Sequence, residues 1–218
     1  MLESIVVPAN LLTFPLSPDA VRLLRDADER ISDFTRRQRP WVENFAVCDF
    51  RLVDAALAWI GEADLARGER FCEWGSGFGV VAMLAALRGW DSFGIEVEPV
   101  LVDEAQSLAE DHEIEVIFAA GSFIPEGGED SLQIVDDISH IDMDCPSGYD
   151  DLDADVADFD LFFAFPWPGE HAYWEAVFDR YAAEGALLLT YHGIESREVD
   201  SLKLQRKVGQ IDRIDETN

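Results

Sequence analysis

The fold is decided by one stretch of the chain, Phe71-Cys72-Glu73-Trp74-Gly75-Ser76-Gly77-Phe78-Gly79. Its first part predicts a short buried strand over 70–74, and the apolar run over 80–87 predicts a helix that follows at once. Glycines at alternate positions let the connecting turn approach a ligand closely, because they carry no β-carbon. The start of the helix adds N–H groups without helical partners. The stretch therefore predicts a nucleotide-like ligand at the C-terminal edge of a sheet.

Strands and helices alternate after this stretch. Strands are predicted over 92–97, 115–119, 159–165 and 186–191, and helices over 100–111 and 170–183. Such alternation implies right-handed crossovers, and hence an α/β fold with a doubly wound, mostly parallel sheet covered by helices on both faces. The tail is expected to add one or two edge strands, over 201–208 and 210–214.

The residues before the glycine-rich stretch have a different pattern. Residues 1–68 are predicted to be helices and turns, with one helix starting at Pro18 and a second running from Phe50 to Ile60. We therefore expect an N-terminal helical lid over 1–68 and a ligand-binding domain over 69–218, a division that suits a chain of 218 residues.

An acidic segment, residues 126–158, interrupts the second unit. It is rich in Asp, Gly and Ser and indicates a solvated insertion. A calcium loop is the less favoured reading, because the ligand order, central glycine and terminal glutamate of an EF-hand are missing. We expect no metal site.

The charge of the chain restricts its partners. It has 45 Asp and Glu against 16 Lys and Arg, a formal charge of −29, and no Lys or Arg over 89–179. Binding to a nucleic-acid backbone or an anionic membrane requires cations, so both partners are unfavoured. A basic partner and a salty environment explain the acidity equally well.

Three cysteines and the hydropathy indicate the cellular setting. Cys48, Cys72 and Cys145 are widely spaced and odd in number, which predicts free thiols and no structural zinc. No stretch approaches the roughly 20 apolar residues that span a bilayer. Residues 1–10 lack the basic and apolar segments of a secretory signal. A cytoplasmic protein without membrane contact is expected.

The glycine spacing distinguishes between nucleotide-like ligands. A dinucleotide-binding G-x-G-x-x-G would need glycine where Val80 stands, and a P-loop would need Lys followed by Ser or Thr. The pattern E-x-G-x-G-x-G over 73–79 instead resembles the first motif of class I methyltransferases, which use S-adenosylmethionine. The resemblance covers roughly residues 45–193 and implies the class I methyltransferase fold.

The resemblance also implies cofactor-binding residues. Glu73 stands where the family contacts the amino group of the cofactor, and Glu96 stands where it binds the ribose hydroxyls; Glu98 is expected to be an exposed helix-start residue. Ser122 and Phe123 follow the third strand, where family members often have Gly-Asp beside the adenine. The expected cofactor-binding set is Glu73, Gly75, Ser76, Gly77, Gly79, Glu96, Ser122 and Phe123.

The loop after the fourth predicted strand, Phe165-Pro166-Trp167-Pro168-Gly169-Glu170-His171, falls where the family binds its acceptor. It resembles in part the loops of amino-methylating enzymes and of tRNA guanine methyltransferases. Apolar Phe165 replaces the polar residue that holds a target amine, and Gly169-Glu170 replaces basic residues of the tRNA enzymes. The loop predicts a flat apolar wall. The candidate catalytic residues are Pro166, Trp167, His171 and His192, and either histidine is suited to act as a general base. A rigid proline turn explains the loop equally well, and a lone histidine is more often structural.

A weaker resemblance concerns residues 45–53, which are similar to the segment that covers the cofactor in class I protein lysine methyltransferases. Asp49 or Phe50 is a candidate for that part, but an amphipathic helix that only packs against the core is the favoured reading. The implied activity is S-adenosylmethionine-dependent methyl transfer, with a small-molecule acceptor favoured, a protein amine next and nucleic acid last. A module that binds the cofactor or its product without turnover stays open, and a dehydrogenase is a more distant alternative.

Overall fold

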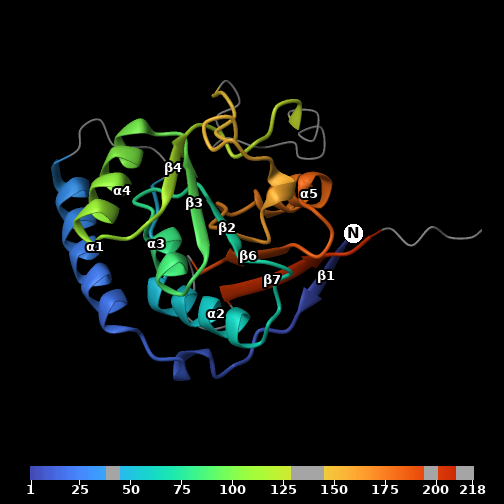
Figure 1. Cartoon of the computed structure of the whole chain (residues 1–218), viewed down its shortest axis with the longest axis horizontal. Helices are drawn as coiled ribbons and strands as arrows, with labels where there is room; N and C mark the ends of the chain where they lie inside the picture. Colours follow the sequence, from blue (N-terminus) through green and yellow to red (C-terminus); the bar gives the residue numbers. More distant parts are fainter. Residues whose placement is uncertain (38–44, 129–144, 194–200, 210–218) are drawn as a thin grey trace, which may run out of the picture.

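The computed structural model describes residues 1–37, 45–128, 145–193 and 201–209. Seven strands form one sheet in the order β1-β7-β6-β5-β2-β3-β4 (Figure 1). The strands are β1 (Leu2–Ile5), β2 (Arg70–Trp74), β3 (Asp91–Glu96), β4 (Ile117–Ala120), β5 (Leu161–Ala164), β6 (Leu187–Tyr191) and β7 (Leu202–Lys207). The helices are α1 (Pro18–Arg37), α2 (Phe50–Glu62), α3 (Val80–Leu87), α4 (Pro99–Asp111) and α5 (His171–Tyr181), with short 3-10 turns η1 (Leu11–Thr13) and η3 (Val156–Asp158).

The sheet is mostly parallel, as predicted. Strands β2 to β6 run in one direction, and β7 is antiparallel to β6. From the central strand β2 the chain passes through β3 and β4 on one side, and then through β5 and β6 on the other. The carboxyl end of β2 therefore lies at the point where the strand order reverses, which is where open α/β sheets bind their ligands.

Helices cover both faces of the sheet. Helices α1 to α4 share one core with side chains of one face, among them Phe71, Leu161 and Leu189. Helix α5 and the segment 149–159 cover the other face, which includes Cys72 and Phe162. Figure 1 shows α1, α3 and α4 on the side of the sheet away from α5. The sheet is thus buried between two apolar layers, and its central strands are nearly continuous apolar runs because both faces are covered.

The N-terminal segment differs from the prediction of helices and turns. Residues Leu2–Ile5 form strand β1, which pairs antiparallel with β7 at the edge of the sheet. The helices of this segment bury Leu23, Ile31 and Leu57 in the same core as α3 and α4. Residues 1–68 therefore share their core with the rest of the described chain.

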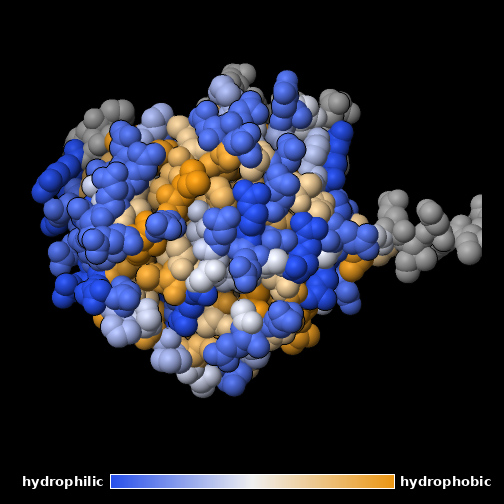
Figure 2. All heavy atoms as spheres, in the orientation of Figure 1, coloured by the Kyte–Doolittle hydropathy of each residue, from blue (hydrophilic) through white to orange (hydrophobic). Residues whose placement is uncertain are grey.

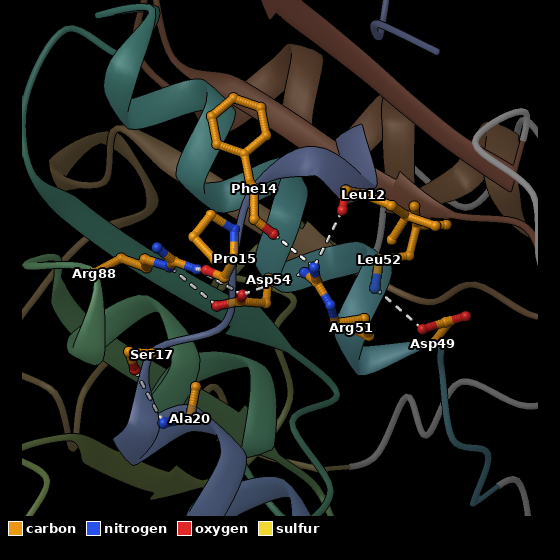
Figure 3. A network of polar contacts seen from close by, with 10 residues as sticks. All are labelled: Leu12, Phe14, Pro15, Ser17, Ala20, Asp49, Arg51, Leu52, Asp54 and Arg88. Atoms are coloured by element: carbon orange, nitrogen blue, oxygen red, sulfur yellow. Dashed lines mark hydrogen bonds and ion pairs between the residues drawn. The ribbon is translucent and has the colours of Figure 1, made fainter. Parts of the chain in front are cut away.

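A buried ion pair anchors this segment. Asp54 of α2 is fully buried and accepts two hydrogen bonds from Arg88, at 3.1 Å from Nε and 2.7 Å from Nη2 (Figure 3). The same guanidinium donates to the carbonyl oxygen of Pro15, and Arg51 donates to those of Leu12 and Phe14. Two arginines thereby hold the connection between β1 and α1 against α2.

The described part of the acidic segment is only partly solvated. Asp150, Asp151 and Asp153 are exposed, as expected, but they alternate with buried apolar residues. Tyr149 and Leu152 belong to the core beneath α5, and the Tyr149 hydroxyl accepts a hydrogen bond of 2.7 Å from Trp74 Nε1. This half of the insertion is therefore a covering layer of the sheet. The predicted short element over 132–135 and the predicted strand over 210–214 lie outside the described residues.

Hydrophilic side chains dominate the face of the molecule seen in Figure 2. On α1 they form ion pairs such as Arg30 with Asp26, 3.1 Å apart, and the same helix buries Leu23 and Ala27. In the described ranges no helix combines the length and apolar character needed to cross a bilayer. Within the same ranges, His, Cys, Asp and Glu side chains do not gather in threes as a metal site would require.

Candidate active site

A cavity of about 350 Å³ lies at the carboxyl ends of β2, β3 and β5. Its floor is the glycine-rich turn between β2 and α3. Walls come from the ends of neighbouring strands, from Phe45 to Cys48 ahead of α2, and from the start of α5. Its volume is within the range of small-molecule and cofactor sites, and it lies at the reversal of strand order.

The turn that forms the floor has three glycines in the left-handed region. Gly75, Gly77 and Gly79 have φ of +66°, +53° and +66°. The amide of Ser76 donates to the carbonyl oxygen of Ile95 at 3.0 Å, and that of Gly79 to the carbonyl oxygen of Ser76 at 2.7 Å, so the turn is tied to β3 and to itself. Gly75, Ser76 and Gly77 line the cavity, whereas Gly79 caps α3 behind it. The role of Gly79 is to shape the turn, since it does not face the cavity.

Glu73 lies at the end of β2 with 5% of its surface exposed. Its Oε2 accepts a hydrogen bond of 2.8 Å from the amide of Ala82, in the first turn of α3. Burial raises the pKa of Glu73 well above its ordinary value of 4.5, although this hydrogen bond acts in the opposite sense. The carboxyl group therefore joins the glycine turn to the helix while it lines the cavity.

Glu96 lies across the turn at the end of β3. Its Oε2 accepts a hydrogen bond of 2.8 Å from the amide of Gly77, and its Oε1 accepts one of 3.1 Å from that of Glu98. Burial raises the pKa of Glu96, and these hydrogen bonds oppose the shift. Glu98 is not the exposed helix-start residue that was expected: it is half-buried and also lines the cavity, because the chain turns into α4 across the opening.

Ser122 and Phe123 lie on the wall that follows β4, as expected. The Ser122 hydroxyl accepts a hydrogen bond of 3.1 Å from the amide of Ile124. The Phe123 ring stacks on Trp174, with centroids 4.0 Å apart and planes at 18°, and lies 5.0 Å from Trp74. Trp74 and Trp174 are themselves 6.1 Å apart at 44°, so the three rings pack against one another behind this wall.

The candidate catalytic residues separate into two groups. Trp167 lines the cavity, but Pro166, His171 and His192 are not among its described lining residues. The histidine rings stack on each other, with centroids 4.2 Å apart and planes at 9°. His192 also forms a 2.7 Å hydrogen bond with Thr190, and burial lowers the pKa of His192 to about 4. The two histidine rings therefore contact each other, and neither ring lines the cavity.

Sequence reasoning missed two residues at the cavity, Glu170 and Trp174. They stand four positions apart at the start of α5, so they occupy one side of the helix. That spacing, directly after a proline-rich turn, is a signal that the sequence contains. Phe50, one of the two residues expected to cover the cofactor, also lines the cavity, whereas Asp49 caps α2 by accepting from the amide of Leu52 at 3.1 Å.

The charged groups on the cavity wall are all acidic. Among the described lining residues these are Glu73, Glu96, Glu98 and Glu170, and that set contains no Lys, Arg or His. A pyrophosphate would find no cation there. S-adenosylmethionine, whose sulfonium and ammonium groups are positive, matches this charge, and the glycine floor and aromatic walls suit its adenosyl group.

Comparison with models of known families and with curated sequences finds no match to this chain. Solved structures do resemble it. A methyltransferase from Geobacter sulfurreducens has a TM-score of 0.51 at 13% identity, over 89% of this chain and 92% of that one. An RNA methyltransferase from Salinibacter ruber in complex with S-adenosyl-L-homocysteine has a TM-score of 0.47 at 16% identity, over 71% and 88%. An O-methyltransferase from Bacillus cereus has a TM-score of 0.47 at 15% identity, over 81% and 67%.

The similarity to the Geobacter sulfurreducens structure extends over nearly the whole of both chains. Together with the strand order and the glycine turn at its reversal point, it identifies the fold of this chain as the class I methyltransferase fold.

Proposed function

We propose that the chain is an S-adenosylmethionine-dependent methyltransferase with a small-molecule acceptor. The observation that carries the proposal is the cavity at the strand-order reversal, in which a glycine turn lies between two buried glutamates. Glu73 and Glu96 flank Gly75 to Gly77, and the described charged groups of the wall are all carboxylates. Such a site favours a cationic nucleoside over an anionic dinucleotide.

The cofactor supplies a methyl group activated by the sulfonium, and the residues of the chain hold and orient the reactants. Glu73 would take the ammonium group, Glu96 the ribose hydroxyls, and the wall of Ser122 and Phe123 the adenine. Trp167 and Phe165 would exclude water on the acceptor side. Alignment of this kind is worth roughly 7–11 kcal/mol of barrier in well-oriented reactions, so the proposal does not depend on a general base at the cavity.

The direct test is titration calorimetry of the purified chain with S-adenosylhomocysteine, S-adenosylmethionine and NAD. We expect binding of the first two and none of NAD, because the described residues of the cavity wall offer no cation to a pyrophosphate. Methyl transfer from labelled cofactor to a lysate, separated into small-molecule, protein and RNA fractions, then tests turnover. Label is expected in the small-molecule fraction. Binding without label in any fraction would favour a cofactor-binding module.

Replacement of the ribose carboxylate is expected to weaken cofactor binding. Glu96→Ala should lower the affinity for S-adenosylhomocysteine by roughly 1–3 kcal/mol, because it removes a hydrogen-bond acceptor and leaves the buried Gly77 amide unpaired. Glu98→Ala is the comparison, because Glu98 also lines the cavity but is only half-buried, and it should lower the affinity less than Glu96→Ala does. A larger loss for Glu98→Ala than for Glu96→Ala in calorimetry would assign the ribose to Glu98 instead.

Proton release on binding is expected from the raised pKa values of Glu73 and Glu96. Above pH 4.5 the ligand-free protein retains protons on these carboxyls that the unfolded chain loses, so its stability falls as pH rises through their folded-state pKa values. A cationic ligand favours the ionised carboxylates, so affinity for S-adenosylmethionine should rise with pH over the same window.

Calorimetry in buffers of different ionisation enthalpy measures the protons released. S-adenosylhomocysteine, which lacks the sulfonium charge, should release fewer; equal release by both ligands would contradict this coupling.

A further inference from the structure

Glu170 differs from the other buried glutamates on the cavity wall. Glu73 and Glu96 each accept a hydrogen bond from a backbone amide of the fold, at 2.8 Å. Glu170 is 3% exposed, and its Oε1 is buried without a hydrogen-bond partner among the described residues. A buried carboxylate oxygen without a partner is costly, so a structure that keeps one on a cavity wall indicates a ligand that pairs with it.

The start of α5 does not use this side chain as a cap. Glu170 occupies the N-cap position directly before α5, where a side-chain oxygen commonly accepts a hydrogen bond from the helix, but its carboxylate makes no such bond. Its position comes from the backbone instead: the amide of Glu170 donates to the carbonyl oxygen of Trp167 at 3.0 Å, across a turn in which Gly169 has φ of +97°. The turn places Trp167 and Glu170 on the same cavity wall.

A second unpartnered polar atom lies one helical turn further. Trp174 is 7% exposed, and its Nε1 has no hydrogen-bond partner among the described residues. Its ring is fixed by the stack on Phe123, and Phe165 is fixed by an edge contact with Tyr191, with centroids 5.0 Å apart. The described surroundings of the Glu170 carboxylate are therefore aromatic rings held by their own contacts. Aromatic rings cannot neutralise a carboxylate, so a ligand with a positive charge would do so. An ammonium group between a carboxylate and aromatic faces is stabilised by both.

We propose that Glu170 and the rings of Trp167 and Phe165 form the acceptor subsite, bounded on the adenine side by Trp174, and that the acceptor is a small amine. This inference rests on the proposed function, because it takes the remaining part of the cavity to hold the cofactor. The low exposure of Glu170 and Trp174 favours a free small molecule over an amine carried on a protein surface.

Methyl transfer to an amine in this subsite needs no reactant other than the amine and S-adenosylmethionine. The ammonium form of the acceptor pairs with Glu170 and transfers one proton to its carboxylate, which frees the nitrogen lone pair. That lone pair forms the bond to the methyl carbon, while the carbon–sulfur bond breaks and its electron pair stays on sulfur. The products are a methylated ammonium and a neutral thioether. Glu170 returns its proton to solvent when the product leaves.

The test uses calorimetry with the full chain saturated with S-adenosylhomocysteine. The probes are tryptamine and benzylamine, each compared with the alcohol of the same shape, tryptophol and benzyl alcohol. At least one amine should bind about tenfold or more tightly than its alcohol, and Glu170→Gln should remove that preference. Glu175→Gln is the matched control on the same helix: Glu175 pairs with Lys203 at 2.6 Å and is not a described cavity residue, so the preference should persist.

Several outcomes would overturn the inference. If the wild-type protein binds amines and alcohols equally, or binds neither, Glu170 is not an amine site. A capped lysine tripeptide that binds better than both small amines would assign the subsite to proteins. If Glu170→Gln weakens S-adenosylhomocysteine itself by about tenfold, Glu170 belongs to the cofactor. Melting temperature serves as the folding control, since Oε1 of Glu170 has no hydrogen-bond partner among the described residues that the substitution could break. Failure of the wild-type protein to bind S-adenosylhomocysteine would instead refute the proposed function and this inference with it.

Discussion

An Arg88→Met variant should lose roughly 3–5 kcal/mol of unfolding free energy, because the substitution leaves Asp54 buried without its main partner. Asp54 is fully buried, and Arg88 satisfies both of its carboxylate oxygens while it also holds the carbonyl oxygen of Pro15 (Figure 3). Desolvation of an unpaired carboxylate costs more than the packing of the methionine side chain recovers. Urea denaturation followed by circular dichroism measures the loss.

Two companion variants separate the charge from the packing. Asp54→Asn should be milder, because Arg88 is 22% exposed and water can solvate its guanidinium. The double variant Asp54→Leu with Arg88→Met should recover most of the stability, since no buried charge is left without a partner. Arg51 Nη1 lies 4.0 Å from Asp54 Oδ2. If Arg88→Met has the same unfolding free energy as the wild-type protein, Arg51 pairs with Asp54 in its place and the hydrogen bonds of Arg88 are not needed for stability.

The part of the fold that is local in sequence was predictable. The strand Arg70–Trp74 and the helix Val80–Leu87 have the predicted bounds, because apolar runs are separated there by glycines that only a tight turn explains. The proximity of Glu73 and Glu96 was predictable for a related reason: both residues end parallel strands that lie side by side, and such ends meet at one edge of the sheet.

The part that depends on distant contacts was not predictable. Strand β1 has four residues with no clear alternation, and it pairs with β7 from the other end of the described chain. His171 begins α5 and His192 follows β6, and the direction of a side chain just beyond a strand or at the start of a helix depends on its packing partners. The two rings stack on each other, and this contact is absent from any local pattern. The burial of Glu170 likewise depends on a turn whose direction only the folded chain defines.

The second large effect is expected for Gly79→Ala, which should lower the unfolding free energy by roughly 2–5 kcal/mol. Gly79 has φ of +66°, a conformation that strains a residue with a side chain, and an added β-carbon would lie 2.3 Å from the ring of Phe118. The backbone strain and the clash with Phe118 both arise at the residue that caps α3. They therefore also disturb the glycine turn, in which the Gly77 amide donates to Glu96.

Gly89→Ala is the control that separates these two costs. Gly89 has φ of +93°, but an added β-carbon there would meet no atom within 4 Å, so only the backbone strain of roughly 1–3 kcal/mol remains. The double variant Gly79→Ala with Phe118→Leu should regain part of the loss if the ring is the obstacle. Gly79→Ala should also weaken S-adenosylhomocysteine, whereas Gly89→Ala should not, because Gly89 lies at the far end of α3. Equal effects of the two substitutions on stability and on binding would show that the ring of Phe118 does not restrict the turn.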